Sequence, residues 1–331
     1  MPFIALDAPV PAGAPQLVAT LAPGCAPLAG ALASGGATAF RLNASHMRPA
    51  ALAEALASVR RQCPGAPLLV DLQGAKMRLG WIADRPVAEG ERVRFSIDPA
   101  EGVALPHPEL YRQVAPHEVV SVDDGRIRLE VLETGEGRLE ARALTPGTLS
   151  ARKGVNLEQH PVRLHGLTGP DVEAVAIALA AGVRAFAFSF MTDGGEARWV
   201  RERAPGALVI GKVERAEAVG QLAAIASRTD AVWICRGDLG AQLGAARLAR
   251  AVAGLSPPEF RVPVLMAGQV LQHLVDHGEP TRSEVCHLHD LLARGYAGIV
   301  LSDETAIGRD PVRAVRAASS LLQALMPPAP A

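Results

Sequence analysis

Short apolar runs recur along the chain, each bounded by glycine or proline and each followed by an alanine-rich segment with helical spacing. This alternation is typical of βα units arranged around a parallel sheet. The runs predict eight strands, over residues 17–23, 37–45, 67–73, 185–190, 208–214, 231–236, 263–269 and 297–302.

Polar side chains lie at or just beyond the carboxyl end of each run. They are Thr20, Asn43, Asp71, Ser189, Glu214, Asp238, Gln269 and Ser302. In an eight-stranded α/β barrel, the carboxyl ends of the strands form the face that holds the active site. We therefore expect a (β/α)8 TIM barrel of the α/β class, with its active site at this face.

One interval between these polar residues is much longer than the others. Asp71 and Ser189 are 118 residues apart, whereas the other neighbouring pairs are 23 to 33 residues apart. Within the extra length, alternating polar and apolar residues at 126–131 and 138–143 predict antiparallel strands of a small all-β domain. An insert at this end of a barrel is well placed to act as a lid. The expected domains are a TIM barrel catalytic domain over 1–74 and 166–331, and a β-barrel lid domain over 75–165, inserted after strand 3.

The overall composition argues against several classes of protein. The 331 residues include 33 Lys and Arg against 34 Asp and Glu, which gives no reason to expect a nucleic acid or an anionic membrane as partner. The four cysteines form no C-x-x-C pair, which favours a reducing compartment. The N-terminus lacks the features of a secretory signal, and prolines and glycines interrupt the uncharged stretch 8–40. We expect a cytoplasmic protein without a transmembrane segment.

Several charged residues near the strand ends suit a site for a phosphorylated acid. Lys212 and Glu214 are two apart on one strand and therefore share a face, which places a cation beside a carboxylate. Asp238 supplies a second carboxylate, and Mg²⁺ prefers such oxygen ligands together with water and substrate oxygens. Arg41 adds a bidentate donor for phosphate or carboxylate. Taken singly, each also fits a surface ion pair or a turn, but their joint position at one barrel end favours a site.

Seven short segments together resemble the motifs of the pyruvate kinase family, in order and in spacing. They are 41–46 (RLNASH), 122–125 (VDDG), 153–156 (KGVN), 212–214 (KVE), 236–240 (RGDLG), 280–284 (PTRSE) and 301–306 (LSDETA). The resemblance covers nearly the whole chain. It implies a barrel with an inserted lid domain and a Mg²⁺-dependent transfer of a phosphoryl group from phosphoenolpyruvate to ADP, which yields pyruvate and ATP.

The resemblance also implies roles for the charged residues at the barrel mouth. Lys212 would stabilise the phosphoryl group in flight, and Arg41 would contact the transferring phosphate. Glu214 and Asp238 would hold Mg²⁺. The backbone amides of Gly237 and Asp238 would bind the carboxylate of the substrate. These are charge-stabilising roles, as phosphoryl transfer requires.

Further residues match the family's cation and nucleotide sites. Asn43, Ser45 and Asp71 resemble ligands of a monovalent cation. Arg78 and Lys153 match basic residues that approach the nucleotide, ADP or ATP, and the lid would supply Lys153 only when closed.

The chain departs from the family pattern at five positions. Gly268 stands where the family has a threonine that contacts the substrate carboxylate, and Leu72 and Gln73 replace a threonine and a lysine. Lys76 replaces a glutamate, and Asp303 replaces a glycine and adds a carboxylate near the barrel mouth. Two interpretations of Lys76 stay open: its ammonium takes over the charge of K⁺, so that K⁺ is not required, or it is a solvent-exposed lysine on a hinge.

These departures leave two alternatives to the kinase. One is a Mg²⁺-dependent lyase, an aldolase or decarboxylase that forms an enolate of another 2-oxo acid. The other is a non-catalytic paralogue that binds a phosphorylated metabolite. We also expect the family's C-terminal regulatory domain to be absent and, if the chain associates, a homodimer rather than a tetramer. Two interpretations are open for Cys235, a reactive thiolate beside Arg236 or a small buried hydrophobe, and the second is the commoner case. We expect His287 to be an ordinary polar residue.

Overall fold

The computed structural model describes residues 15–123 and 125–325, and the chain divides into two compact units. One unit combines 1–72 with 167–331 and the other spans 73–166, so the chain leaves the first unit once and returns to it once. The sequence predicts the first boundary after residue 74, two residues later than in the structure. It predicts the second boundary after residue 165, one residue earlier than in the structure. The N-terminal segment from which we argue against a secretory signal lies outside the described residues.

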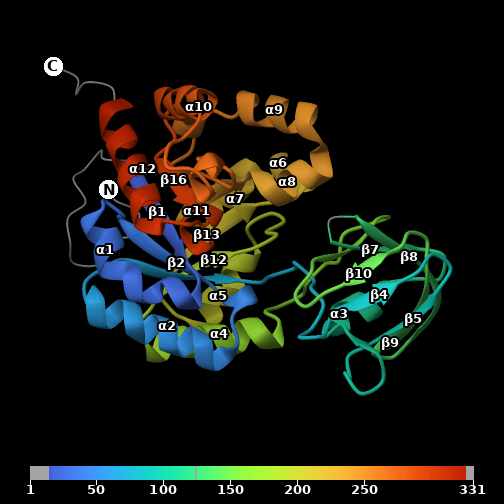
Figure 1. Cartoon of the computed structure of the whole chain (residues 1–331). Coiled ribbons are helices and arrows are strands. Elements are labelled where there is room, and N and C mark those ends of the chain that lie inside the picture. The colour runs from blue at the N-terminus through green and yellow to red at the C-terminus, as the bar shows by residue number, and fades with distance from the viewer. Residues whose placement is uncertain (1–14, 124, 326–331) are drawn as a thin grey trace. The chain divides into compact units, whose positions relative to one another are not determined.

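Eight parallel strands of the larger unit hydrogen bond to one another in chain order and close into a barrel (Figure 1). This confirms the expected TIM barrel, and each expected run overlaps one observed strand. The third strand pairs directly with the fourth barrel strand, although 94 residues of the second unit separate them in sequence. The barrel strands are β1 (Gln16–Leu21), β2 (Ala39–Asn43), β3 (Leu68–Leu72), β12 (Ala185–Phe188), β13 (Leu208–Val213), β14 (Ala231–Cys235), β15 (Val264–Ala267) and β16 (Gly298–Leu301).

Helices follow the strands and cover the outside of the barrel (Figure 1). Two of them begin at capping residues: Thr168 accepts the amide of Asp171, and Thr281 forms a reciprocal capping box with Glu284. The helices of this unit are α1 (Ala29–Ser34), α2 (Pro49–Gln62), α4 (Gly169–Ala180), α5 (Glu196–Arg203), α6 (Ala216–Val219), α7 (Leu222–Arg228), α8 (Arg236–Leu243), α9 (Ala245–Gly254), α10 (Arg282–Ala293), α11 (Asp303–Ala306) and α12 (Pro311–Leu325). Its short 3₁₀ helices are η1 (Pro23–Leu28), η2 (Ala44–His46), η3 (Pro257–Glu259) and η4 (Gln272–Val275).

The barrel interior is filled mainly by small and branched side chains around one large ring. Trp233 is buried among residues from other barrel strands, including Ala187, Ala267 and Val300. Alternating large and small side chains fill a closed barrel without leaving a channel, so the strands form a packed core beneath the site.

The second unit is predominantly β, as expected, and its described residues, 73–123 and 125–166, include one short helix. A six-stranded sheet runs in the order β11, β7, β8, β9, β5, β6, and β10 pairs with β4. The elements of this unit are β4 (Arg85–Val87), β5 (Arg92–Ser96), β6 (Val103–Ala104), α3 (Pro108–Tyr111), β7 (Val119–Val122), β8 (Ile127–Gly135), β9 (Arg138–Ala143), β10 (Gly147–Leu149) and β11 (Val155–Leu157).

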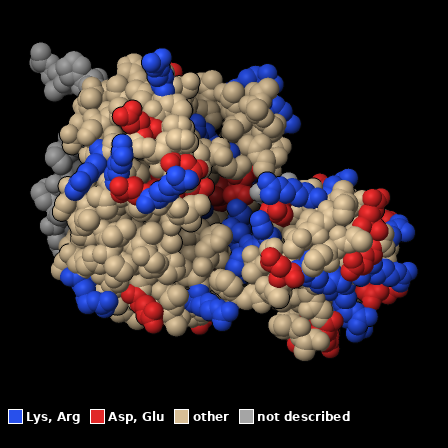
Figure 2. Space-filling view, in the orientation of Figure 1, with Lys and Arg blue, Asp and Glu red and all other residues tan. Residues whose placement is uncertain are grey.

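On the face that Figure 2 shows, charged side chains of both signs are interspersed over this second unit. Arginines and glutamates pair across neighbouring strands, as in Arg94 with Glu140 and Arg142 with Glu130. Such exposed pairs contribute little to stability and mainly keep the sheet surface polar. None of the helices in the described part of the chain has the length and apolar composition that crossing a bilayer requires.

Candidate active site

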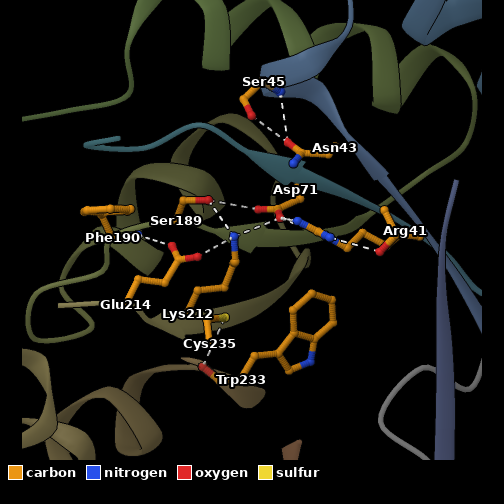
Figure 3. A network of polar contacts seen from close by, with 11 residues as sticks. Arg41, Asn43, Ser45, Asp71, Ser189, Phe190, Lys212, Glu214, Trp233 and Cys235 are labelled. Atoms are coloured by element: carbon orange, nitrogen blue, oxygen red, sulfur yellow. Dashed lines mark hydrogen bonds and ion pairs between the residues drawn. The ribbon is translucent and has the colours of Figure 1, made fainter. Parts of the chain in front are cut away.

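Lys212 lies near the carboxyl end of β13 at the centre of a buried polar network (Figure 3). Its Nζ donates to Asp71 Oδ2 at 2.9 Å and to Ser189 Oγ at 2.8 Å, and it is 3.0 Å from Glu214 Oε1. Burial acts to lower the pKa of the ammonium, but the negative charges of Asp71 and Glu214 outweigh burial and raise it. Lys212 therefore stays protonated, and its positive charge is shielded from solvent.

Asp71 connects Lys212 to a second cation. Its Oδ2 also accepts from Arg41 Nε at 2.8 Å, while its Oδ1 accepts from Ser189 Oγ at 3.1 Å. Arg41 Nη1 in turn donates to Thr20 Oγ1 at 2.9 Å. Burial acts to raise the pKa of Asp71, but Lys212 and Arg41 lower it overall. The carboxylate thus fixes the directions of two cations that are expected at the phosphoryl group.

Strand register explains why these side chains meet. Arg41, Asp71, Ser189 and Lys212 come from or directly follow β2, β3, β12 and β13, which are consecutive in the barrel. Parallel neighbours align their carboxyl ends, so residues far apart in sequence converge at one edge. The sequence marks Ser189 and Thr20 as strand-end polar residues but assigns them no role, because that role depends on contacts between strands.

Glu214 is held from its other side by a backbone amide. Phe190 N donates to Glu214 Oε2 at 2.9 Å, and Phe190 has a φ of 58°, in the left-handed region. Bulky side chains rarely adopt this conformation, and such strain concentrates at functional sites. The Arg215 guanidinium lies 5.3 Å from the centre of the Phe190 ring. No sequence signal points to this arrangement.

Glu214 and Asp238 form a donor set that suits Mg²⁺. Glu214 directly follows β13, and Asp238 lies in the first turn of α8, just after the neighbouring strand β14. Both donors are carboxylates, and Mg²⁺ in phosphate chemistry is commonly held by one or two carboxylates with substrate oxygens and water. Residues 15–123 and 125–325 contain no cluster of three or more His, Cys, Asp or Glu that could hold a metal alone. Two carboxylates alone would leave the coordination of Mg²⁺ incomplete, so substrate oxygens and water would have to supply its remaining ligands.

Asn43 and Ser45 form a separate pair beside Asp71. Ser45 donates to Asn43 Oδ1 through its backbone amide at 3.2 Å and through its Oγ at 2.7 Å. Asn43 is aligned with Asp71 in the register of β2 and β3 (Figure 3). Three residues are expected at a monovalent cation. Two of them, Asn43 and Ser45, hydrogen bond to each other, whereas the third, Asp71, forms ion pairs with Arg41 and Lys212.

The expected nucleotide residues belong to the second unit. Arg78 Nη1 donates to the carbonyl of Arg152 at 2.7 Å, and Lys153 Nζ lies 2.8 Å from Asp123 Oδ1. Arg78 is buried, whereas the Lys153 side chain is 40% exposed. Lys76 is half-buried in the same unit.

Gly268 has a backbone that explains the missing side chain. Its φ is +81°, and a Cβ added there would lie 3.2 Å from the amide nitrogen of Gly237. A β-branched residue in this conformation would be strained, so glycine is a requirement of the local backbone. Among the other departures, Leu72 is buried at the end of β3, Gln73 is buried at the start of the second unit, and Asp303 is exposed.

Cys235 is buried in the barrel core, in agreement with its interpretation as a small hydrophobe. Burial raises the pKa of its thiol well above the usual value, which disfavours the reactive thiolate.

Comparison with known proteins decides the family. The family described as "Pyruvate kinase, barrel domain" matches residues 14–315. The chain belongs to the pyruvate kinase family. The pyruvate kinase of Methylorubrum extorquens is 34% identical over 293 residues, which cover 85% of this chain and 61% of that protein. A pyruvate kinase of Agrobacterium vitis is 33% identical over 309 residues, covering 87% and 63%, respectively.

A pyruvate kinase of Mycobacterium tuberculosis is 33% identical over 273 residues, which cover 78% of this chain and 57% of that protein. The chain thus spans about three fifths of the length of the curated pyruvate kinases it matches.

Proposed function

We propose that this chain carries out the pyruvate kinase reaction, the transfer of a phosphoryl group from phosphoenolpyruvate to ADP with formation of pyruvate and ATP. The observation that carries the proposal is the buried Lys212 ammonium, fixed between Asp71 and Glu214 at the carboxyl ends of the barrel strands. Relatives named pyruvate kinase over most of the chain support the same conclusion.

The residues of the site act by placing charge where the transition state gathers it. Lys212 and Arg41 offer two cations to the oxygens of the phosphoryl group, and Asp71 holds both in place without solvent reorganisation. The amides of Gly237 and Asp238 hold the carboxylate of phosphoenolpyruvate. Arg78 and Lys153 of the second unit bind the phosphates of ADP.

Mg²⁺ would be held by Glu214 and Asp238, and when bound it neutralises charge on the phosphate oxygens. The amide of Phe190 keeps Glu214 oriented for this role. Lys76, in the place of the family glutamate, supplies the positive charge of K⁺, so we propose that K⁺ is not required.

Turnover with phosphoenolpyruvate, ADP and Mg²⁺ tests the proposal. A coupled assay should detect pyruvate, and Lys212→Met should abolish its formation, a loss of at least about 10³-fold. Arg198→Met is the matched control, because Arg198 is an exposed cation of the same barrel and should leave the rate unchanged. Calorimetric binding of phosphoenolpyruvate without turnover by the wild-type chain would instead support the non-catalytic paralogue. The same assay with and without K⁺ tests Lys76.

Gly268 favours a second candidate, the enolate-forming lyase. Its left-handed backbone strains any side chain and so disfavours the hydroxyl that the family places near the reacting carbon, while the carboxylate donors at Glu214 and Asp238 are retained. Incubation with Mg²⁺ and a panel of 2-oxo acids, followed by mass spectrometry, tests this activity. An unreactive panel counts against it.

A further inference from the structure

Arg236 joins three segments that are far apart in sequence. This residue begins α8, and its guanidinium donates through Nε to the carbonyl of Gly268 at 2.9 Å and through Nη2 to the carbonyl of Gln269 at 2.6 Å. Its Nη1 lies 2.8 Å from Nε2 of His287, on α10. Three of its five N–H donors are thus directed to specific acceptors.

The two carbonyls belong to a left-handed backbone segment, a conformation that Gly268 tolerates but that a residue with a side chain, here Gln269, rarely adopts. Gly268 has a φ of +81° and Gln269 a φ of 53°, so two successive residues lie in the left-handed region. Such a conformation persists only where surrounding contacts hold it. The two hydrogen bonds from Arg236 are such contacts, because they fix consecutive carbonyls to one rigid, planar group.

This segment borders the amide of Gly237, one of the two amides that we expect to hold the substrate carboxylate. A Cβ on Gly268 would lie 3.2 Å from Gly237 N and 3.4 Å from Arg236 N. The α-carbon of Gly268 therefore lies close to the amide of Gly237. A shift of the segment by a fraction of an ångström would change the space available to the carboxylate.

The contact between Arg236 and His287 requires a neutral imidazole. An arginine side chain only donates, so Nε2 of His287 must accept and the proton of the ring must be on Nδ1. Burial and the charge of Arg236 lower the pKa of His287, Arg294 also lowers it, and Asp290 opposes them. The charged or titratable groups that act on Arg236 itself are Glu304, Tyr296 and Glu284.

We propose that His287 is a positioning residue of the substrate site: it holds the Arg236 guanidinium, which in turn fixes the Gly268–Gln269 backbone against the amide of Gly237. The expected effect on the KM for phosphoenolpyruvate rests on the proposed function, whereas the effect on the backbone of residues 268–271 does not. His287 itself touches no substrate. Protonation of its ring would place a hydrogen on Nε2, which would then face the N–H donor of Arg236. The hydrogen bond would be lost and the guanidinium would no longer be held.

Two variants separate the hydrogen bond from the shape of the side chain. His287→Leu removes the acceptor, whereas His287→Gln keeps an acceptor oxygen near the position of Nε2. We expect His287→Leu to raise the KM for phosphoenolpyruvate about tenfold, the range for a hydrogen bond to a charged group, with a smaller change in kcat. His287→Gln should restore a KM near that of the wild type. His289→Leu, an exposed histidine on the same helix, is the matched control.

The pH profile adds a signature that a purely structural role would lack. In the wild type, the KM for phosphoenolpyruvate should rise as the pH falls through the depressed pKa of His287, while in His287→Gln this rise should be absent. Equal KM values and equal pH profiles for the wild type and His287→Leu would overturn the proposal.

Hydrogen exchange distinguishes failure of this proposal from failure of the proposed function. In His287→Leu without any ligand, the amides of residues 268–271 should exchange faster than in the wild type, and in His287→Gln they should not. Unchanged exchange in His287→Leu overturns the positioning role whether or not the chain turns over phosphoenolpyruvate. Faster exchange in a chain without turnover leaves His287 as a positioning residue and rejects the kinase alone.

Discussion

Asp71→Asn tests the central ion-pair network. Asp71 is completely buried and accepts from Arg41, Lys212 and Ser189. With Glu214, the two carboxylates balance the two cations, so the network is formally neutral. Asparagine keeps the shape of the aspartate side chain but removes its negative charge. One positive charge of the buried network is then left without a compensating carboxylate.

The expected loss follows from that imbalance. Removing one partner of a buried ion pair costs about 3–5 kcal/mol, because the remaining charge stays buried. At 1.4 kcal/mol per factor of ten, the ratio of unfolded to folded protein should rise by about two to three and a half powers of ten. Lys212→Met leaves an excess negative charge instead, while the double variant is again neutral. The two losses should therefore be less than additive.

Urea denaturation followed by tryptophan fluorescence, to which the buried Trp233 contributes, measures these free energies of unfolding. Glu202→Gln is the control, because its pair with Arg198 is exposed and should contribute less than about 1 kcal/mol. A loss in Asp71→Asn as small as that of the control would refute the reasoning. So would fully additive losses in the Asp71 and Lys212 double variant, since they would mean that the two charges do not interact.

Three further outcomes are expected. Burial lowers the pKa of His107 to about 4, so as the pH falls the unfolded chain binds a proton at this residue before the folded chain does. The free energy of unfolding should therefore be constant above about pH 6.5 and should drop by up to about 3 kcal/mol towards pH 4. Urea titrations monitored by tryptophan fluorescence should show this drop, and His107→Gln should remove it. Iodoacetamide should modify the exposed Cys286 and spare Cys235 by mass spectrometry; comparable labelling would contradict the burial argument. Gly268→Thr should lower stability by about 1–3 kcal/mol without raising turnover, and a gain in turnover would show that the left-handed backbone tolerates the hydroxyl.

The fold could be predicted because its signals are local. Each barrel strand is a short apolar run with glycine or proline nearby, and the extra spacing between Asp71 and Ser189 marks the insertion. The proximity of Lys212 and Glu214 likewise follows from the two-residue period of a strand, and their charged atoms are 3.0 Å apart.

The partners of the site residues could not be predicted in the same way. The sequence assigns Arg41 to the phosphate and Asp71 to a monovalent cation, whereas the structure also pairs them with each other. That pairing depends on the register of β2 against β3 and on side-chain rotamers, which no local pattern encodes. For the same reason the sequence predicts only an ordinary polar role for His287, because its contact with Arg236 joins residues of two helices that are 51 positions apart.

The direct pairing of β3 with β12 has an evolutionary consequence. In the barrel, β3 pairs with β12 through Val70, Asp71 and Leu72, although the 94 residues of the second unit lie between these strands in sequence. The closed barrel sheet therefore contains no strand of the second unit. Insertions are best tolerated where they interrupt no backbone pairing of their host. The inserted module can therefore lengthen, shorten or diverge in sequence among relatives while the barrel that carries Lys212 keeps its geometry.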